Sequence, residues 1–296
     1  MEPWILFSIL AAAAQTIRFA LQKSVAKKTL SVAATTWARF FWSWPVAALI
    51  VIFYANMREL QMPSLSWQFF IFAIAGGVFQ ILATACTISL FSLRAFAVGI
   101  TFKKTEVMLT ALVGFVILGD RISTLGFVAI LIGLAGVLLL SQTPSSKSIF
   151  NRAAGIGLLS GVLFALAAVT YRGATQAISS GDTVLTAGVT LAIVSFWQTL
   201  GLGIWIAVKE PDQIGATLRS WRTTSFVSLF SLIGSWSWFA AFTLMNAAYV
   251  FAVGQVELIF SALIGMIWFK ERLTKRELAG MSILLVSIMS LTLFVS

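Results

Sequence analysis

A chain of 296 residues that is 59% hydrophobic and only 10% charged is too apolar for a water-soluble domain, in which about half of the residues are apolar and about a quarter charged. Its single cysteine, Cys86, and its lack of histidine exclude an internal disulfide and a Cys/His metal site, and no cofactor is expected. The net charge of +10 indicates basic loops beside a membrane and argues against nucleic acid as a partner.

Long apolar segments separated by polar breaks predict ten transmembrane helices, because a helix needs about 20 mostly apolar residues to cross a bilayer. In chain order the expected spans are 4–22, 33–54, 67–91, 95–118, 123–141, 154–177, 183–208, 225–245, 248–269 and 274–295. The fold class predicted is therefore an all-α, multi-pass integral membrane protein, placed in the plasma or inner membrane.

A polar stretch at Ser141–Arg152, which contains a proline and clustered serines, divides the chain into two halves of five spans each. We predict a first unit over residues 1–142, a linker over 143–153 and a second unit over 154–296. An odd number of spans in each half makes the halves inverted copies, a plan common among secondary transporters, in which the substrate site lies at mid-depth between the repeats.

Two motifs support the internal repeat. The segments Thr16–Gln22 and Thr170–Gln176 share Thr, Arg, Ala and Gln at identical spacing. The fourth and ninth spans both start with Ala-Val-Gly, then carry Glu106 and Glu257, and end in a short turn of acidic and basic residues. Polar residues that recur inside apolar runs are hard to explain by chance.

The same segments carry a family resemblance. They are Arg39-Phe40, the stretch from Glu106-Val107 to Gly119-Asp120-Arg121, the stretch from Glu257-Leu258 to Lys270-Glu271-Arg272-Leu273, and the helix glycines Gly133, Gly136 and Gly280. Through them nearly the whole chain resembles the EamA family of the drug/metabolite transporter superfamily. Asp120 and Lys270 depart from the usual Glu and Gly. The resemblance implies two inverted five-helix repeats around a central cavity, and export or exchange of small metabolites such as amino acids.

Charged residues inside apolar spans are costly in lipid, so they are the first candidates for a substrate site. Gln15, Arg18 and Gln22 form one stripe of the first span, and Arg172 lies on the matching stripe of the sixth. One interpretation is that the two arginines bind an anionic group or form a gate. The other is that they extend to the lipid headgroups from positions near helix ends.

Arg39, in the second span, is predicted to contact substrate or to pair with Glu106 or a neighbouring carbonyl group. Lys103 and Glu106 lie three residues apart on one helix face, together with the adjacent Lys104. They form either a self-neutralising buried pair or a site that binds a substrate carboxylate and a substrate ammonium or proton.

Glu257 has no basic residue within one turn of its own helix, and burial without a cation favours a protonated carboxyl group. It is the preferred candidate for proton coupling, the alternative being a hydrogen bond to a neighbouring helix. Trp197, Gln198 and Trp238 are expected to line a cavity for an apolar or aromatic group, or else to pack against lipid, and Gln255 completes the candidate substrate-binding set.

The five basic and two acidic residues within the spans disfavour a cavity for lipophilic cations and favour a zwitterionic or anionic substrate. We therefore predict a secondary transporter, an exporter or exchanger of such a metabolite, most simply an amino acid, that works by alternating access. A channel, a lipid scramblase or a multidrug exporter is the alternative. An enzyme is not expected, because a catalytic constellation is lacking. Membrane lipid and a small-molecule substrate are the expected partners, and a monomer is compatible with the sequence.

Lysines and arginines concentrate in the loops after the odd-numbered spans, which hold Lys23, Lys27, Lys28, Arg94, Lys147, Arg152, Lys209, Arg219, Arg222, Lys270, Arg272, Lys275 and Arg276. The opposite loops hold Arg58 and Arg121. Because basic loops stay in the cytoplasm, this bias predicts that both termini lie outside it.

Overall fold

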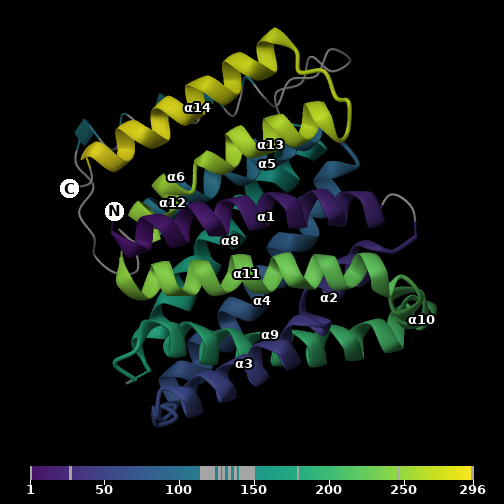
Figure 1. Ribbon diagram of the computed structural model, residues 1–296. Helices are drawn as coiled ribbons and strands as arrows, with labels where there is room; N and C mark the ends of the chain where they lie inside the picture. The colour runs from purple at the N-terminus through teal and green to yellow at the C-terminus, as the bar shows by residue number, and fades with distance from the viewer. Residues whose placement is uncertain are drawn as a thin grey trace.

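The computed structural model of the chain describes residues 2–26, 29–113, 151–178, 180–245 and 247–294, with scattered positions between 124 and 139. Figure 1 shows long helices lying side by side and running between two ends of a bundle. The N- and C-terminal helix ends lie at one end, and α10 with the loop between α1 and α2 lies at the other. We call these the terminal end and the basic end, the latter because it carries most of the described loop lysines and arginines.

The helices of the first half are α1 (Pro3–Ala26), α2 (Val32–Phe41), α3 (Ser43–Met57), α4 (Trp67–Phe91), α5 (Phe96–Lys103) and α6 (Thr105–Val113). Those of the second half are α8 (Arg152–Gln176), α9 (Thr183–Lys209), α10 (Asp212–Arg219), α11 (Trp221–Leu244), α12 (Ala247–Val253), α13 (Val256–Ile267) and α14 (Lys275–Phe294).

Every expected span except 123–141 coincides with a described helix or pair of helices. The span 123–141 and the linker 143–153 lie largely outside the described residues. Seven of the described helices or helix pairs are long and apolar enough to cross a membrane. Short α10, between α9 and α11, was not predicted, because its alternating polar residues read as a loop.

Side-chain caps fix where several helices begin. Ser31, Ser66, Asn151 and Asp182 each accept a hydrogen bond from the backbone N–H three residues on, at the starts of α2, α4, α8 and α9. Such caps satisfy an N–H that has no partner within the helix. The second span is interrupted at Trp42, because the ring of Pro45 clashes with the carbonyl four residues earlier.

Small residues set the closest helix contacts. The longest packed pairs are α1 with α11 and α4 with α8. At Gly161 of α8 an added Cβ would lie 2.1 Å from Thr105 Oγ1, so only glycine allows the start of α6 to approach α8 this closely. The centre of the bundle thereby brings α1, α6, α8 and α13 together.

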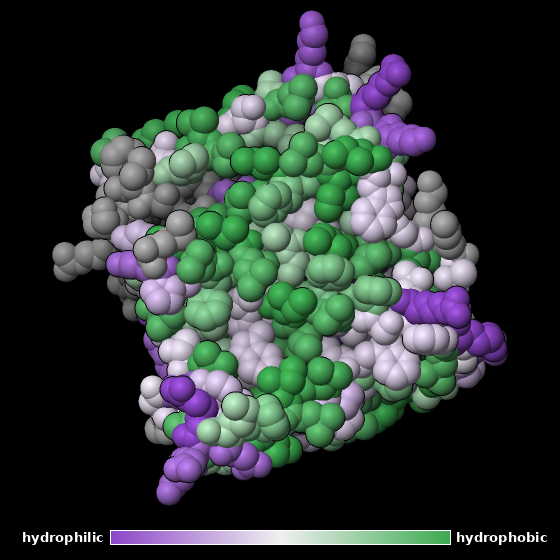
Figure 2. All heavy atoms as spheres, viewed as in Figure 1, coloured by the Kyte–Doolittle hydropathy of each residue, from purple (hydrophilic) through white to green (hydrophobic). Residues whose placement is uncertain are grey.

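The face of the bundle that Figure 2 shows is apolar between two more polar ends. Large side chains such as Leu49, Phe53 and Ile267 are 67%, 65% and 76% exposed. An apolar band of this kind suits lipid and not water. The chain is a multi-pass membrane protein.

Candidate functional site

Two transmembrane segments are broken at the centre of the bundle. The fourth expected span separates into α5 and α6 at Lys104, and the ninth into α12 and α13 at Gly254 and Gln255. Each break ends two residues before a glutamate, so Glu106 lies in the first turn of α6 and Glu257 in the first turn of α13. A helix N-terminus favours a carboxylate, because its backbone N–H groups carry partial positive charge.

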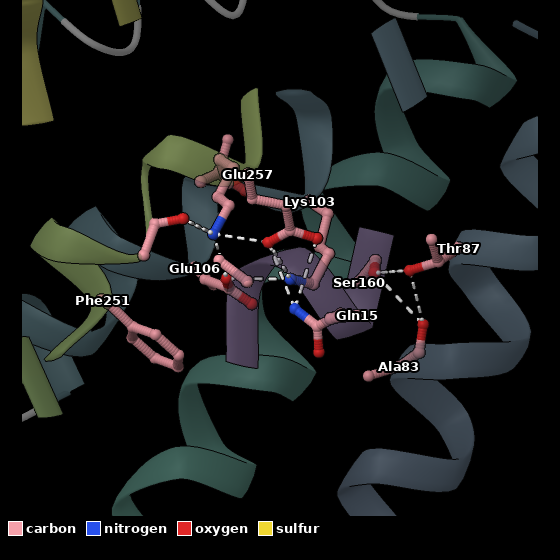
Figure 3. Close-up of polar contacts among 12 residues, drawn as sticks. Gln15, Ala83, Thr87, Lys103, Glu106, Ser160, Phe251 and Glu257 are labelled. Carbon is pink, nitrogen blue, oxygen red and sulfur yellow. Dashed lines mark hydrogen bonds and ion pairs between the residues drawn. The ribbon is translucent and has the colours of Figure 1, made fainter. Parts of the chain in front are cut away.

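The two breaks are joined by a cluster of four charges (Figure 3). Lys103 Nζ lies 3.1 Å from Glu106 Oε1 and 3.3 Å from Glu257 Oε2. Lys104 Nζ lies 3.5 Å from Glu106 Oε1 and 2.7 Å from Glu257 Oε2. Lys104 also donates a hydrogen bond at 3.1 Å to the Gly254 carbonyl, which lies in the second break and also accepts from the Glu257 backbone N–H. All four charged side chains are buried and together carry no net charge.

The expectation that Glu257 lacks a cationic partner is wrong. Its partners come from the break in the opposite half, about 150 residues away in sequence, and a search within one helical turn could not find them. Gln15 adds a hydrogen bond from its amide to each Glu257 oxygen, at 3.3 and 3.2 Å. The alternative that Glu257 is held by a neighbouring helix is confirmed.

Arg18 is 1% exposed and does not extend to the membrane surface, so that interpretation is also wrong. Its guanidinium donates to Gln22 Oε1 at 2.6 Å and to Gln15 Oε1 at 3.4 Å, and lies 3.9 Å from the centre of the Phe19 ring. The predicted stripe on the first span therefore faces the interior. Among the described residues, the amide oxygens of Gln15 and Gln22 accept the hydrogen bonds of Arg18, and no carboxylate does.

Arg39 is held by three hydroxyl groups. It donates to Ser231 at 3.0 Å, to Thr84 at 3.0 Å and to Ser235 at 3.1 Å. The predicted ion pair between Arg39 and Glu106 is absent from the salt bridges of the described residues. The side chain is 2% exposed and ties α2 to α4 and α11.

A small cavity lies beside the charge cluster, at the level of the helix breaks. It is lined by Gln15, Gln80, Lys103, Glu106, Phe164, Ala167, Ala168, Tyr171, Ser235, Trp238, Phe239, Phe242 and Phe251. Its volume is about 30 Å³, which is room for a few water molecules at most. Aromatic rings form one wall, where Trp238 and Phe242 stack at 5.9 Å and Phe251 meets both edge to face.

The structure divides the predicted site residues into two groups. Gln15, Lys103, Glu106 and Trp238 line the cavity, and Arg18, Arg39 and Glu257 contact that lining or stand directly behind it. Gln255 is buried and donates to the Phe251 carbonyl at 2.7 Å, which fixes a cavity residue without reaching the cavity.

Three other predicted residues lie outside the cavity. Arg172 is half-buried on α8 and is not part of the lining. Trp197 is 44% exposed and Gln198 is buried, and both line a separate apolar crevice of about 990 Å³ between α2, α4 and α9. The prediction that Trp197 lines a cavity therefore applies to this crevice.

Sequence reasoning missed Gln80, Tyr171 and Ser235. Tyr171 Oη donates to Gln80 Oε1 at 2.9 Å, and Gln198 Nε2 donates to the same oxygen at 3.0 Å. These side chains separate the crevice, which Gln198 lines, from the cavity, which Gln80 and Tyr171 line. A single polar residue in the middle of an apolar span was the available signal, and it was applied to charged residues and to some glutamines but not to these three residues.

Comparison with known proteins gives a family and a fold. Residues 152–293 match the model of the EamA-like transporter family. A solved structure, described only as the crystal structure of a protein, aligns over 99% of this chain and 96% of its own, with 16% identity and a TM-score of 0.66. At that identity the likeness shows a shared fold. The search of curated proteins found no match.

Proposed function

Because this chain belongs through its second half to the EamA-like transporter family of the drug/metabolite transporter superfamily, we propose that it is a secondary transporter for a small zwitterionic or anionic metabolite. An amino acid is the simplest such substrate. The protein exports or exchanges it by alternating access.

The observation that carries the proposal is the Lys103–Glu106 pair in the cavity wall. The two opposite charges lie 3.1 Å apart, are each 1% exposed and share the cavity with an aromatic wall. A zwitterion can replace one contact of such a pair: its ammonium binds Glu106, and its carboxylate binds a cationic or hydrogen-bond-donating group. Lys103 then keeps Glu257 at 3.3 Å, so no buried charge is left alone.

The broken helices support a carrier. Secondary transporters commonly bind substrate where discontinuous helices from two inverted repeats meet near the bilayer midplane. Under the proposed repeat, α1 corresponds to α8 and α4 to α11. The two longest packed pairs, α1 with α11 and α4 with α8, are then equivalent contacts.

The charge balance argues against a multidrug exporter of lipophilic cations. Among the described residues of the spans, four cations and two carboxylates are almost fully buried, namely Arg18, Arg39, Lys103, Lys104, Glu106 and Glu257. Neither arginine forms a salt bridge within this set. A cationic substrate would meet repulsion, whereas an anionic group would be attracted.

The test is uptake into proteoliposomes that contain the purified full-length chain, screened over amino acids, organic acids, sugar phosphates and lipophilic cations. We expect saturable uptake and counterflow of a zwitterion or anion, which a channel or scramblase would not show. Lys103→Met should abolish uptake, while Lys209→Met, the same change at an exposed lysine, should not. Transport restricted to cations, or uptake without saturation, would refute the proposal.

Two further proposals concern coupling and orientation. The role of proton carrier predicted for Glu257 loses its premise, because Lys103 and Lys104 lie 3.3 and 2.7 Å from its carboxylate and favour the charged form; we therefore expect that a pH gradient does not drive uptake. We also propose a plasma or inner membrane location with the basic end in the cytoplasm, as the loop charges predict. A reporter that is active only in the cytoplasm, fused after Ser296, should then be inactive.

A further inference from the structure

A second set of polar side chains lines the cavity, apart from the charge cluster. It consists of Gln80 on α4 and Ser235 on α11, with Tyr171 of α8 beside them. Tyr171 packs edge to face on Phe239, with ring centres 4.7 Å apart, and this contact joins α8 to α11 at the cavity wall. Three helices thus contribute to one polar patch.

The hydrogen bonds of Gln80 leave its donor group free. Its Oε1 accepts from Tyr171 Oη at 2.9 Å and from Gln198 Nε2 at 3.0 Å, which uses both lone pairs of the amide oxygen. The Nε2 group has no acceptor among the described residues. Because Gln198 is itself fixed by a hydrogen bond to the Gly77 carbonyl at 3.0 Å, the orientation of the Gln80 amide is set from behind.

The same logic applies to Ser235. Its Oγ accepts a hydrogen bond from Arg39 Nη2 at 3.1 Å, and the hydroxyl proton has no acceptor in the part of the chain that the structure describes. Arg39 has no carboxylate partner there: its other hydrogen bonds go to the hydroxyls of Ser231 and Thr84, and its Cζ lies 5.2 Å from the centre of the Phe40 ring. A buried guanidinium held only by neutral oxygens projects positive potential through Ser235 into the cavity.

We propose that Gln80 and Ser235, backed by Arg39, form an oxyanion subsite that binds the carboxylate of the substrate. The inference rests on the proposed transport function and deepens it, because it assigns the two ends of a zwitterion. The carboxylate accepts hydrogen bonds from the Gln80 amide and the Ser235 hydroxyl, and the ammonium donates to the Glu106 carboxylate. The cavity of about 30 Å³ is too small for both groups, so its walls separate when substrate enters.

Arg39 acts in this subsite as a positioning residue. Its three hydrogen bonds hold hydroxyls from α4 and α11 in one place, and its charge compensates the incoming carboxylate. Lysine keeps the charge but cannot form the three-pronged contact, since its ammonium sits at the end of a flexible stem. Arg39→Lys should therefore weaken binding of carboxylates and leave binding of amines unchanged.

The test measures binding to the purified full-length chain by calorimetry, with three ring-matched probes: 3-phenylpropionate, its neutral isostere 3-phenylpropionamide, and phenethylamine. We expect 3-phenylpropionate to bind more tightly than the amide. Ser235→Ala and Gln80→Leu should raise its Kd on the order of tenfold, since each removes a hydrogen bond to a charged group. The Kd of phenethylamine should not change.

The matched control is Ser237→Ala, a buried serine two residues away on α11 that does not line the cavity. It should change no probe's Kd. Equal losses for all three probes in Ser235→Ala would show a purely structural role and overturn the proposal. So would a failure of 3-phenylpropionate to bind at millimolar concentration, or binding no tighter than that of the amide.

Uptake measured in parallel separates this inference from the proposed function. If Ser235→Ala transports the substrate found in the uptake screen with unchanged KM, the subsite is wrong although the protein is a carrier. If carboxylate binding depends on Ser235 but no compound is transported, the subsite stands and the carrier proposal fails. A raised KM with near-normal maximal rate would support both.

Discussion

Replacing Lys104 with methionine should destabilise the fold by about 3–5 kcal/mol, the usual cost of removing one partner of a buried ion pair. Lys104 Nζ lies 2.7 Å from Glu257 Oε2 with both side chains 0% exposed. At an effective dielectric constant near 20, that attraction is about 6 kcal/mol before desolvation is subtracted. The Gly254 carbonyl loses one of its two donors but keeps the Glu257 backbone N–H at 3.1 Å, so no further penalty for an unsatisfied carbonyl is added.

A double-mutant cycle tests this reasoning. Lys104→Met, Glu257→Gln and the double variant are compared by reversible unfolding in mixed micelles, with exposed Lys209→Met as the control for a lost lysine. In the double variant no charge is left without its partner, so its loss should be smaller than the sum of the single losses by at least about 1 kcal/mol. Additive losses, within about 0.5 kcal/mol, would show that the two side chains do not act as a pair.

Two further predictions concern backbone positions and use the same unfolding assay. Gly161→Ala should destabilise by about 1–3 kcal/mol, because the new methyl group would lie 2.1 Å from Thr105 Oγ1, whereas Gly201→Ala, with nothing within 4 Å, should be neutral or slightly stabilising. Lys270→Gly should stabilise by about 0.5 kcal/mol, because Lys270 has a φ of 53° that favours glycine. Lys275→Gly, in the first turn of α14, should destabilise instead. A lower stability of Lys270→Gly than of the parent would contradict the strain argument.

The helix positions followed from hydropathy because a bilayer imposes length and apolarity on each span. The polar stripe on the first span could also be predicted. Gln15, Arg18 and Gln22 are spaced so that they share one helix face, and all three are buried. The positions of α1, α4, α8, α9 and α11 agree with the expected spans to within a few residues at most of their ends.

The helix breaks were not predictable from their own residues. No proline stands at Lys104 or Gln255, and the polar residues at both positions are as compatible with an unbroken helix as with a break. The breaks persist because contacts from outside each segment stabilise them, above all the hydrogen bond from Lys104 to the Gly254 carbonyl. Hydrogen bonds between segments 150 residues apart leave no local pattern in the sequence.

The partners of the charged residues also could not be predicted from the sequence. Arg39 was predicted to contact substrate or to pair with Glu106 or a neighbouring carbonyl group, and it donates instead to the hydroxyls of Thr84, Ser231 and Ser235. Serine and threonine are common in transmembrane helices and pack against neighbours for many reasons. Their role here follows only from the meeting of α2, α4 and α11, which depends on the tertiary fold.

The packing of the two halves differs in a way that gives the transport proposal a direction. Under the proposed inverted repeat, α2 and α4 correspond to α9 and α11. The crevice between α2, α4 and α9 runs from Glu210 at the basic end to Gln198 beside the cavity. At the terminal end Trp236 of α11 instead closes on α9: it donates to the Val184 carbonyl at 3.2 Å, and a Cβ at Gly188 would lie 2.5 Å from its ring. The crevice therefore reaches the basic end, whereas the described parts of α9 and α11 pack together at the terminal end. Exchange of the two packing arrangements would move the opening to the other end while the charge cluster stays at the crossing of the broken helices, which is the motion that alternating access requires.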